Sequence, residues 1–568
     1  MKPLAQWLRL LALAGILPGL ASAAGISERY AARYLETFPT RATAAGLYTH
    51  DARIESLDTP ARQRWIEFNR RVLAALERGE TDGEATLDLD LLRRQVALEI
   101  MEWQDEARPT NDPLFWAEPL AQATLYLLLR RDRPASERLA LAANRTEAIP
   151  ALVSQALDAL AEADPARVVP VRAREAAGRL RALAGFYRDG LPAADGADDA
   201  LRKRLRTAGA KAADAIDELA ARADSLADAG IADFRLGSAY ATRFRLVTAI
   251  ETPVPQLLAQ AHQDLTHKRA EAAAYGRGVW SRLRGDEPVP LDDDAVLRAL
   301  FRSIEASHPQ STAELVAQYQ ADADAAFAFA AKHELMTLPE PRTLVVGTAP
   351  AWLGGQSVGG VYPAGPYQPD AETLFLLPNV PDDAPDAAKQ HFYGAFNSAF
   401  NRMIVPHELV PGHYVQLKVA ARQPHPLRSL FGDGVYTEGW GSFSERLMLD
   451  RGWGGPPERL AHYKKQLENI ARLIADISVH TQGWDQPRLA DFLRDEALLD
   501  EQFAANMWKR AQLTSPQLTT YHLGYRQIHA IWIDWRRAHP DAPLREFVDG
   551  MLGLGAVPVA AYRASLLP

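Results

Sequence analysis

Apolar residues recur every three or four positions along most of residues 26–330, which is the spacing of amphipathic helices. The stretches 151–163 (ALVSQALDALAEA) and 173–190 (AREAAGRLRALAGFYRDG) show this spacing clearly, and proline and glycine interrupt the runs near residues 190 and 284. No fixed-period repeat accompanies the pattern, which argues against a solenoid. This part of the chain is predicted to be an all-helical scaffold.

The pattern changes between about residues 341 and 381. Runs of β-branched and apolar residues at 343–346 (TLVV) and 373–377 (TLFLL) flank a glycine-rich loop at 354–365 (GGQSVGGVYPAG). We therefore expect one small antiparallel β-sheet here. Helical patterning resumes near residue 386 and continues to the C-terminus, so the predicted fold is mainly α.

The first residues have the composition of a signal peptide. Lys2 and Arg9 precede an apolar run at 10–20 and the small residues 21–23 (ASA), which predicts cleavage between Ala23 and Ala24. The apolar run is too short to span a bilayer comfortably, and no later segment is long and apolar enough to do so. We expect a periplasmic or secreted protein without a membrane span.

Composition narrows the chemistry. The formal net charge of -9 comes without a basic stripe, which argues against a nucleic-acid partner. The chain has 0 cysteines, so disulfides, a thiol nucleophile, a thiolate metal ligand and a lipid-acceptor cysteine are all excluded. Any catalytic chemistry must come from His, Asp, Glu, Ser, Tyr or a metal.

A candidate metal site lies in residues 406–417 (PHELVPGHYVQL). His407 is predicted to continue one apolar stripe of a helix, and Glu408 follows it directly. The stripe consists of Phe392, Phe396, Phe400 and Met403. His407 and His413 are six positions apart, which on a regular α-helix turns them about 120° away from each other.

Pro411 and Gly412 change this geometry. Proline cannot donate a helical hydrogen bond and glycine tolerates distortion, so the pair could widen a turn and return His413 to the face of His407. We predict a bulge between Glu408 and His413.

Three segments resemble a known family. Residues 407–416 (HELVPGHYVQ), 436–447 (YTEGWGSFSERL) and 515–528 (SPQLTTYHLGYRQI) are similar to segments of the bacterial family called domain of unknown function 885. This family is grouped with zinc metallopeptidases of the H-E-x-x-H type. The resemblance implies one zinc ion bound by His407, His413 and Glu438, with Glu408 as the general base.

The chemistry of these residue types agrees with that implication. Two neutral imidazoles and one carboxylate leave a fourth zinc position open for a water molecule, whose pKa the metal lowers to near neutrality. Glu408 can take a proton from that water and pass it to the leaving amine. Glu445, two helical turns after Glu438, is a rival third ligand or a hydrogen-bond partner for a ligand histidine.

Further candidates surround this core set. Tyr521 and Tyr525 are four residues apart and share a helix face, so either phenol could stabilise an oxyanion or simply pack; the resemblance favours Tyr521 as catalytic. His522 is a candidate partner of a ligand histidine, and Arg526 a candidate for a substrate carboxylate.

The glycine-rich loop is a candidate for binding an extended peptide through backbone N–H groups. Gly359 and Gly360 lie at its centre, and the alternative interpretation is a simple cluster of turns.

Taken together, these features predict a zinc metallopeptidase, a hydrolase that cleaves short peptides as an oligopeptidase, dipeptidase or exopeptidase. The expected architecture is a large multi-helical peptidase-like fold with a deep cleft. We expect residues 24–335 to form the scaffold and cleft wall, and residues 336–568 the sheet and the zinc-binding catalytic region, in one continuous fold. The alternatives are a non-catalytic periplasmic protein that binds peptide or metal, and a zinc amidohydrolase acting on other amides. The sequence leaves the oligomeric state open.

Overall fold

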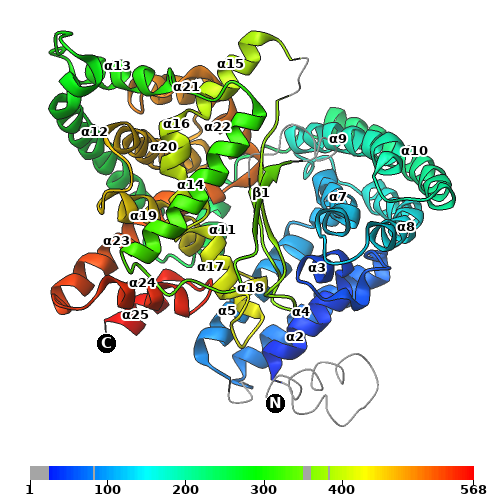
Figure 1. Ribbon diagram of the computed structural model, residues 1–568. Helices are drawn as coiled ribbons and strands as arrows, with labels where there is room; N and C mark the ends of the chain where they lie inside the picture. The colour runs from blue at the N-terminus through cyan, green and yellow to red at the C-terminus, as the bar shows by residue number, and fades with distance from the viewer. Residues whose placement is uncertain (1–24, 81–83, 350–359, 381–383, 568) are drawn as a thin grey trace. The chain divides into compact units, whose positions relative to one another are not determined.

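The computed structural model describes residues 25–80, 84–349, 360–380 and 384–567 (Figure 1). The predicted signal peptide lies outside these ranges. Within them the chain forms many helices and one three-stranded sheet, so the prediction of a mainly α fold is confirmed. No helix in the described ranges has the length and apolarity needed to cross a membrane.

The chain divides into two compact units. Unit 1 comprises Met1–Ala232, Gly365–Gln368 and Gln423–Phe431. Both helical stretches predicted in this unit are confirmed, since they fall in α8 and in α9 with the turn that follows it. Its helices are α2 (Ile26–Thr37), α3 (Pro39–Ala44), α4 (Thr59–Glu77), α5 (Thr86–Ile100), α6 (Arg108–Asn111), α7 (Pro113–Leu129), α8 (Ala135–Ala161), α9 (Pro170–Gly185), α10 (Asp199–Ala229) and α18 (Leu427–Leu430).

Alanine and leucine build the core of unit 1. Helix α10 packs against both α8 and α9, and its buried face includes Ala208, Ala212 and Ile216, which are spaced by four residues. Asp198 begins this helix because its carboxylate accepts a hydrogen bond from the backbone N–H of Leu201 at 2.8 Å. Small buried residues let these long helices pack closely.

Unit 2 comprises Asp233–Ala364, Pro369–Arg422 and Gly432–Pro568 and contains every described candidate site residue. Its helices are α11 (Tyr240–Thr248), α12 (Val254–Arg284), α13 (Asp293–Glu305), α14 (Thr312–Lys332), α15 (Asp386–Ala395), α16 (Ser398–Glu408), α17 (His413–Ala420), α19 (Gly434–Leu449), α20 (Pro456–Gln482), α21 (Gln486–Asp495), α22 (Glu501–Thr514), α23 (Thr520–Ala538), α24 (Leu544–Gly553) and α25 (Val559–Leu566). Its strands are β1 (Leu344–Thr348), β2 (Gly360–Tyr362) and β3 (Thr373–Leu377).

Helix α20 is the central helix of unit 2 (Figure 1). It packs against α12, α16, α19 and α23, and residues 471–480 are all buried. A helix that is buried on every face has no solvent side for its polar residues. Each polar side chain on α20 therefore needs a partner within the protein or a ligand.

Helices α19 and α23 cross in backbone contact. A Cβ atom added to Gly439 would lie 2.4 Å from the backbone of Gly524, and one added to Gly524 would lie 1.9 Å from the carbonyl oxygen of Val435. Glycine is required at this crossing because any side chain would separate the two helices. The crossing brings Glu438, next to Gly439, toward Tyr521, which lies one turn before Gly524.

The sheet is mixed, so the prediction of an antiparallel sheet is wrong for one of its two strand pairs. The strand order is β1-β3-β2, with β3 parallel to β1 and antiparallel to β2. The connection from β1 to β3 is long enough for a crossover, which a parallel pair requires. The third strand, β2, forms inside the stretch that was predicted to be a glycine-rich loop.

Candidate metal centre

The two candidate histidines lie at the junction of two helices. Helix α16 ends at Glu408, Leu409 has non-helical dihedral angles, and α17 begins at His413. The predicted bulge within one helix is therefore wrong, because the helix stops and a second one starts. His407 is in the last turn of α16 and His413 in the first turn of α17, so the two side chains face each other across the break.

Proline and glycine fit this break. Pro411 has no N–H to continue α16, and the Val410–Pro411 peptide bond is cis. A Cβ on Gly412 would lie 1.9 Å from the carbonyl oxygen of His407 and 2.3 Å from that of Pro406. Only glycine allows the chain to turn back this closely onto the end of α16.

The apolar stripe that precedes His407 lies on two helices instead of one. Helix α15 ends at Ala395, and Asn397 starts α16 because its side chain accepts a hydrogen bond from the N–H of Phe400 at 2.9 Å. Asparagine competes with the helical backbone for N–H groups and so favours a new N-terminus. The prediction that His407 is buried is nevertheless confirmed, since the residue is 3% exposed.

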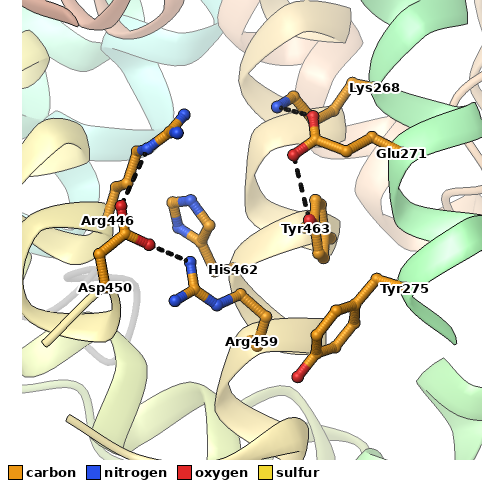
Figure 2. A pocket seen from close by; sticks show the side chains of 8 residues that line it. All are labelled: Lys268, Glu271, Tyr275, Arg446, Asp450, Arg459, His462 and Tyr463. Carbon is orange, nitrogen blue, oxygen red and sulfur yellow. Dashed lines mark hydrogen bonds and ion pairs between the residues drawn. The ribbon is translucent and has the colours of Figure 1, made fainter. Parts of the chain in front are cut away.

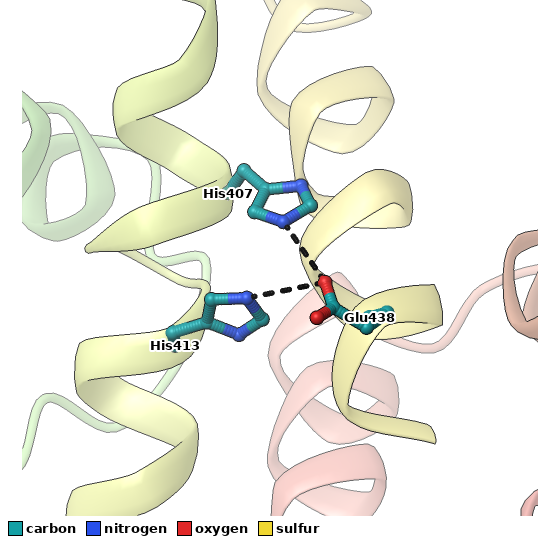
Figure 3. Close-up of side chains that lie close together, drawn as sticks. All are labelled: His407, His413 and Glu438. Atoms are coloured by element: carbon teal, nitrogen blue, oxygen red, sulfur yellow. Dashed lines mark ion pairs between the residues drawn. The ribbon is translucent and has the colours of Figure 1, made fainter. Parts of the chain in front are cut away.

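His407, His413 and Glu438 converge on one point (Figure 3). The Nε2 atoms of the two histidines lie 3.5 and 3.6 Å from the same Glu438 oxygen, and one ligand atom from each residue lies within 4.8 Å of the others. Two ligands about 2.1 Å from a tetrahedral zinc ion are about 3.4 Å apart. The two histidine–glutamate separations are close to this value, and two imidazoles with one carboxylate form a donor set that could hold a zinc ion.

Glu445 fixes the orientation of His407. Its carboxylate is fully buried and lies 2.8 Å from His407 Nδ1, on the opposite side of the ring from the Nε2 atom that faces Glu438. A carboxylate on Nδ1 favours the tautomer whose Nε2 lone pair is available to a metal. Of the two candidate glutamates, Glu438 thus lies at the Nε2 atom of His407, beside His413. Glu445 lies at the Nδ1 atom of His407, where it is a hydrogen-bond partner of this histidine.

His462 is a residue that the sequence did not reveal. It lies on α20, is 4% exposed, and its Nδ1 atom is 2.8 Å from the second oxygen of Glu445. No motif surrounds it, because its partner lies on another helix 17 residues away. The sequence around it gives no signal of this role, because α20 also carries several charged residues and a second buried histidine, His480.

Charges in the cluster reinforce one another. Burial would lower the pKa of His407, but Glu438 and Glu445 raise it to about 10. Burial would raise the pKa of Glu438, yet the imidazoles of His407 and His413 hold it well below its usual range. Burial likewise would raise the pKa of Glu445, and hydrogen bonds from His407 and His462 lower it to about 2. Both carboxylates thus remain ionised, and His407 holds a proton that a metal ion would displace on binding to Nε2.

Glu408 is beside the cluster without belonging to it. It is the last residue of α16, is partly exposed, and forms no hydrogen bond or ion pair with another residue of the described ranges. Burial and the negative charge of Glu408 both raise the pKa of Tyr319, which places this carboxylate near α14. An unpaired carboxylate next to a candidate metal ligand is available to accept a proton.

The segment around Trp440 holds the junction in place. The indole N–H of Trp440 donates a hydrogen bond to the carbonyl oxygen of Pro411 at 2.9 Å. A Cβ on Gly441 would lie 2.8 Å from the ring of His407, so the imidazole lies directly against this glycine. Helix α19 therefore supplies Glu438. It also contacts the segment between α16 and α17 through Trp440, and the imidazole of His407 through Gly441.

The two candidate tyrosines have different surroundings. Tyr521 is partly buried, and the guanidinium of Arg472 lies 4.8 Å from the centre of its ring. Burial and the charge of Glu438 raise the pKa of Tyr521, and its hydroxyl accepts a hydrogen bond from the side chain of Gln517 at 3.2 Å. Tyr525 instead accepts a hydrogen bond from Arg446 at 3.0 Å and stacks on His529.

The remaining candidates lie elsewhere. His522 and Arg526 face Asp264 of α12, at 2.8 and 3.4 Å, instead of a ligand histidine. Gly360 belongs to β2, where it pairs with Leu376, and Gly359 lies outside the described residues.

A polar cavity of about 280 Å³ lies beyond His462 (Figure 2). Its charged groups are already paired, with Lys268 2.6 Å from Glu271 and Arg459 2.8 Å from Asp450. His462 links the wall of this cavity to Glu445. The lining residues are Lys268, Glu271, Tyr275, Arg446, Asp450, Arg459, His462 and Tyr463.

The fold and this cluster define a mainly α protein with a candidate metal centre of two histidines and one glutamate. The chain belongs to the family described as bacterial protein of unknown function (DUF885), whose model matches residues 39–566. The predicted family is therefore confirmed. No curated protein matches the sequence.

Two solved structures share the fold. One is described as "a putative lipoprotein of unknown function from Shewanella oneidensis"; it is 24% identical, with a TM-score of 0.77, and the match covers 96% of this chain and 99% of that one. The other is "the putative lipoprotein from Colwellia psychrerythraea", 15% identical with a TM-score of 0.76, where the match covers 94% and 96%.

Proposed function

We propose that the protein hydrolyses peptide bonds in short peptides with one zinc ion held by His407, His413 and Glu438. The observation that carries this proposal is the convergence of three ligand atoms from α16, α17 and α19 within 4.8 Å, beside the unpaired carboxylate of Glu408. Two imidazoles with one carboxylate form a donor set typical of catalytic zinc, because it leaves a position open.

The residues of the chain divide the catalytic work. When bound, zinc would supply a Lewis acid that polarises the scissile carbonyl and makes a water molecule more acidic. Glu408 accepts a proton from the attacking water and donates it to the leaving amine. Tyr521 stays protonated because its pKa is raised, and its hydroxyl donates a hydrogen bond to the carbonyl oxygen as negative charge develops.

Recessed ligands favour short substrates. The side chains of His407, His413 and Glu438 are 4, 12 and 20% exposed, so the reacting groups lie below the surface. A peptide end can reach such a position more readily than a loop of a folded protein can.

We place this activity in the cell envelope, in the periplasm or outside the cell. The predicted signal peptide supports export. Two of the solved structures that share the fold are described as putative lipoproteins, which agrees with an envelope location.

Glu408→Gln tests the proposal. The variant should retain about one zinc per chain and lose peptide hydrolysis by at least a hundredfold, because general-base catalysis contributes about that much or more. Metal content and cleavage of a mixed peptide library, with mass spectrometry of the products, are the measurements. Glu334→Gln is the matched control, since His333 and Glu334 form a second His-Glu pair that is exposed at the end of α14.

Unchanged hydrolysis in Glu408→Gln would contradict the mechanism. A wild-type chain that binds peptides and leaves them intact would identify a binding protein. Cleavage confined to amides other than peptides would identify an amidohydrolase.

A further inference from the structure

Arg472 is a buried cation on α20 that lacks a close carboxylate partner. The residue is 8% exposed, and its Nη1 atom donates a hydrogen bond to the side chain of Asn469 at 2.9 Å. The nearest paired carboxylate, that of Glu468, is 3.8 Å away, and the buried Nε atom has no partner among the described residues. Burying a guanidinium with an unused donor is costly unless a ligand completes it.

The carboxylates near Arg472 also interact with other groups. Glu468 is shared with Lys465, which lies 3.5 Å from the same carboxylate. Arg510 adds another cation, and its side chain donates to the neutral amide of Gln517. Glu438 also acts on Arg472 and belongs to the candidate metal centre, while Asp476 on the same helix as Arg472 accepts hydrogen bonds from Tyr240 and Ser515, and burial raises its pKa. Among the described residues, Glu468 at 3.8 Å is therefore the only carboxylate within ion-pair distance of the Arg472 guanidinium.

Arg472 and Arg510 both lie next to the candidate catalytic residue Tyr521. The guanidinium groups of Arg472 and Arg510 are 4.8 and 6.0 Å from the ring centre of Tyr521. On the other side, Asn469 hydrogen-bonds the hydroxyl of Ser442, one turn after Glu438 on α19. Arg472 is thus connected to α19, which carries the proposed ligand Glu438, and to α23, which carries Tyr521.

We propose that Arg472, assisted by Arg510, binds a carboxylate group of the substrate. This inference rests on the proposed peptide hydrolysis and specifies its substrates as short peptides with a carboxylate close to the scissile bond. Arginine suits this role because its planar group forms two parallel hydrogen bonds to a carboxylate. The carboxylate is either the free carboxyl end of the peptide or an acidic side chain.

Equilibrium binding to zinc-loaded Glu408→Gln tests the inference without turnover. The probes are trialanine, trialanine amide, and the amide of a tripeptide with a central aspartate, measured by calorimetry. Trialanine should bind about ten- to a hundredfold more tightly than its amide, since that is the typical contribution of a charged hydrogen bond. Tight binding of the aspartate peptide instead would assign the site to an acidic side chain.

Adding Arg472→Gln should reduce the ratio between the tighter carboxylate peptide and trialanine amide to about one. Arg510→Gln should reduce it partly, and Arg446→Gln, which alters the separate cavity of Figure 2, should leave it unchanged. The thermal unfolding midpoint of Arg472→Gln, measured alongside, reports the structural contribution of the arginine. A purely structural arginine would lower the midpoint and leave the ratio intact.

Equal binding of all three peptides, or a preference that survives Arg472→Gln, would overturn the inference. Failure of the proposed function is distinguishable, because it would appear as absent hydrolysis by the wild-type chain whatever the binding preference.

Discussion

At the scale of single residues, His407 is constrained on every side. Glu445 binds its Nδ1 atom, Gly441 lies against its ring, and its Nε2 atom faces Glu438. Such an arrangement reduces the freedom that a ligand must lose when it binds a metal, which strengthens the site.

Glu445→Gln tests this support. The neutral amide cannot accept hydrogen bonds from His407 and His462 with the strength of a carboxylate, so zinc affinity should fall about ten- to a hundredfold. Competition with a chelator of known affinity measures the change. Glu271→Gln, which alters a carboxylate paired with Lys268 on α12, is the control and should bind zinc like the wild type. Equal affinity in Glu445→Gln would show that the hydrogen bond does not support the site.

Residues that belong to contiguous motifs could be predicted from the sequence, and their partners could not. His407, His413 and Glu438 lie in segments with a recognisable spacing, and the structure brings them together. The sequence left the role of Glu445 open and missed His462 and Arg472. Their partners depend on how α19, α20 and α23 pack, and spacing along one helix carries no information about that.

At the scale of elements, the site depends on an interrupted helix. Pro411 and Gly412 indicated a distortion, but a bulge and a complete break satisfy the same local rules. The outcome is decided by contacts from elsewhere, such as the hydrogen bond from Trp440 to Pro411. The mixed sheet has a similar explanation, since strand direction depends on the path of the connection.

Gly412→Ala tests the break. The new Cβ would lie 1.9 Å from a backbone oxygen of His407, so α16 and α17 would have to move apart. Zinc binding should fall by at least tenfold, because a displacement of about 1 Å is enough to disrupt a preorganised site. Gly394→Ala on α15 is the control, since a Cβ there meets no atom within 4 Å. Wild-type zinc affinity in Gly412→Ala would contradict the proposed role of the break.

At the scale of the whole molecule, hydrophobic periodicity was sufficient to predict a mainly α chain. The periodic signal is strong because long helices repeat it many times, as in α8 and α10. The gathering of α16, α17, α19 and α20 around one point is a long-range property. Only the family resemblance predicted that residues of different helices, such as His407 and Glu438, would lie together.

The metal content of the purified chain tests the central claim most directly. Elemental analysis should find about one zinc per wild-type chain and close to none in His413→Ala, because losing one of three ligands weakens the site severely. His391→Ala, which alters an exposed histidine on α15, should retain the metal. Zinc that is absent from the wild type, or that stays bound in His413→Ala, would contradict the account.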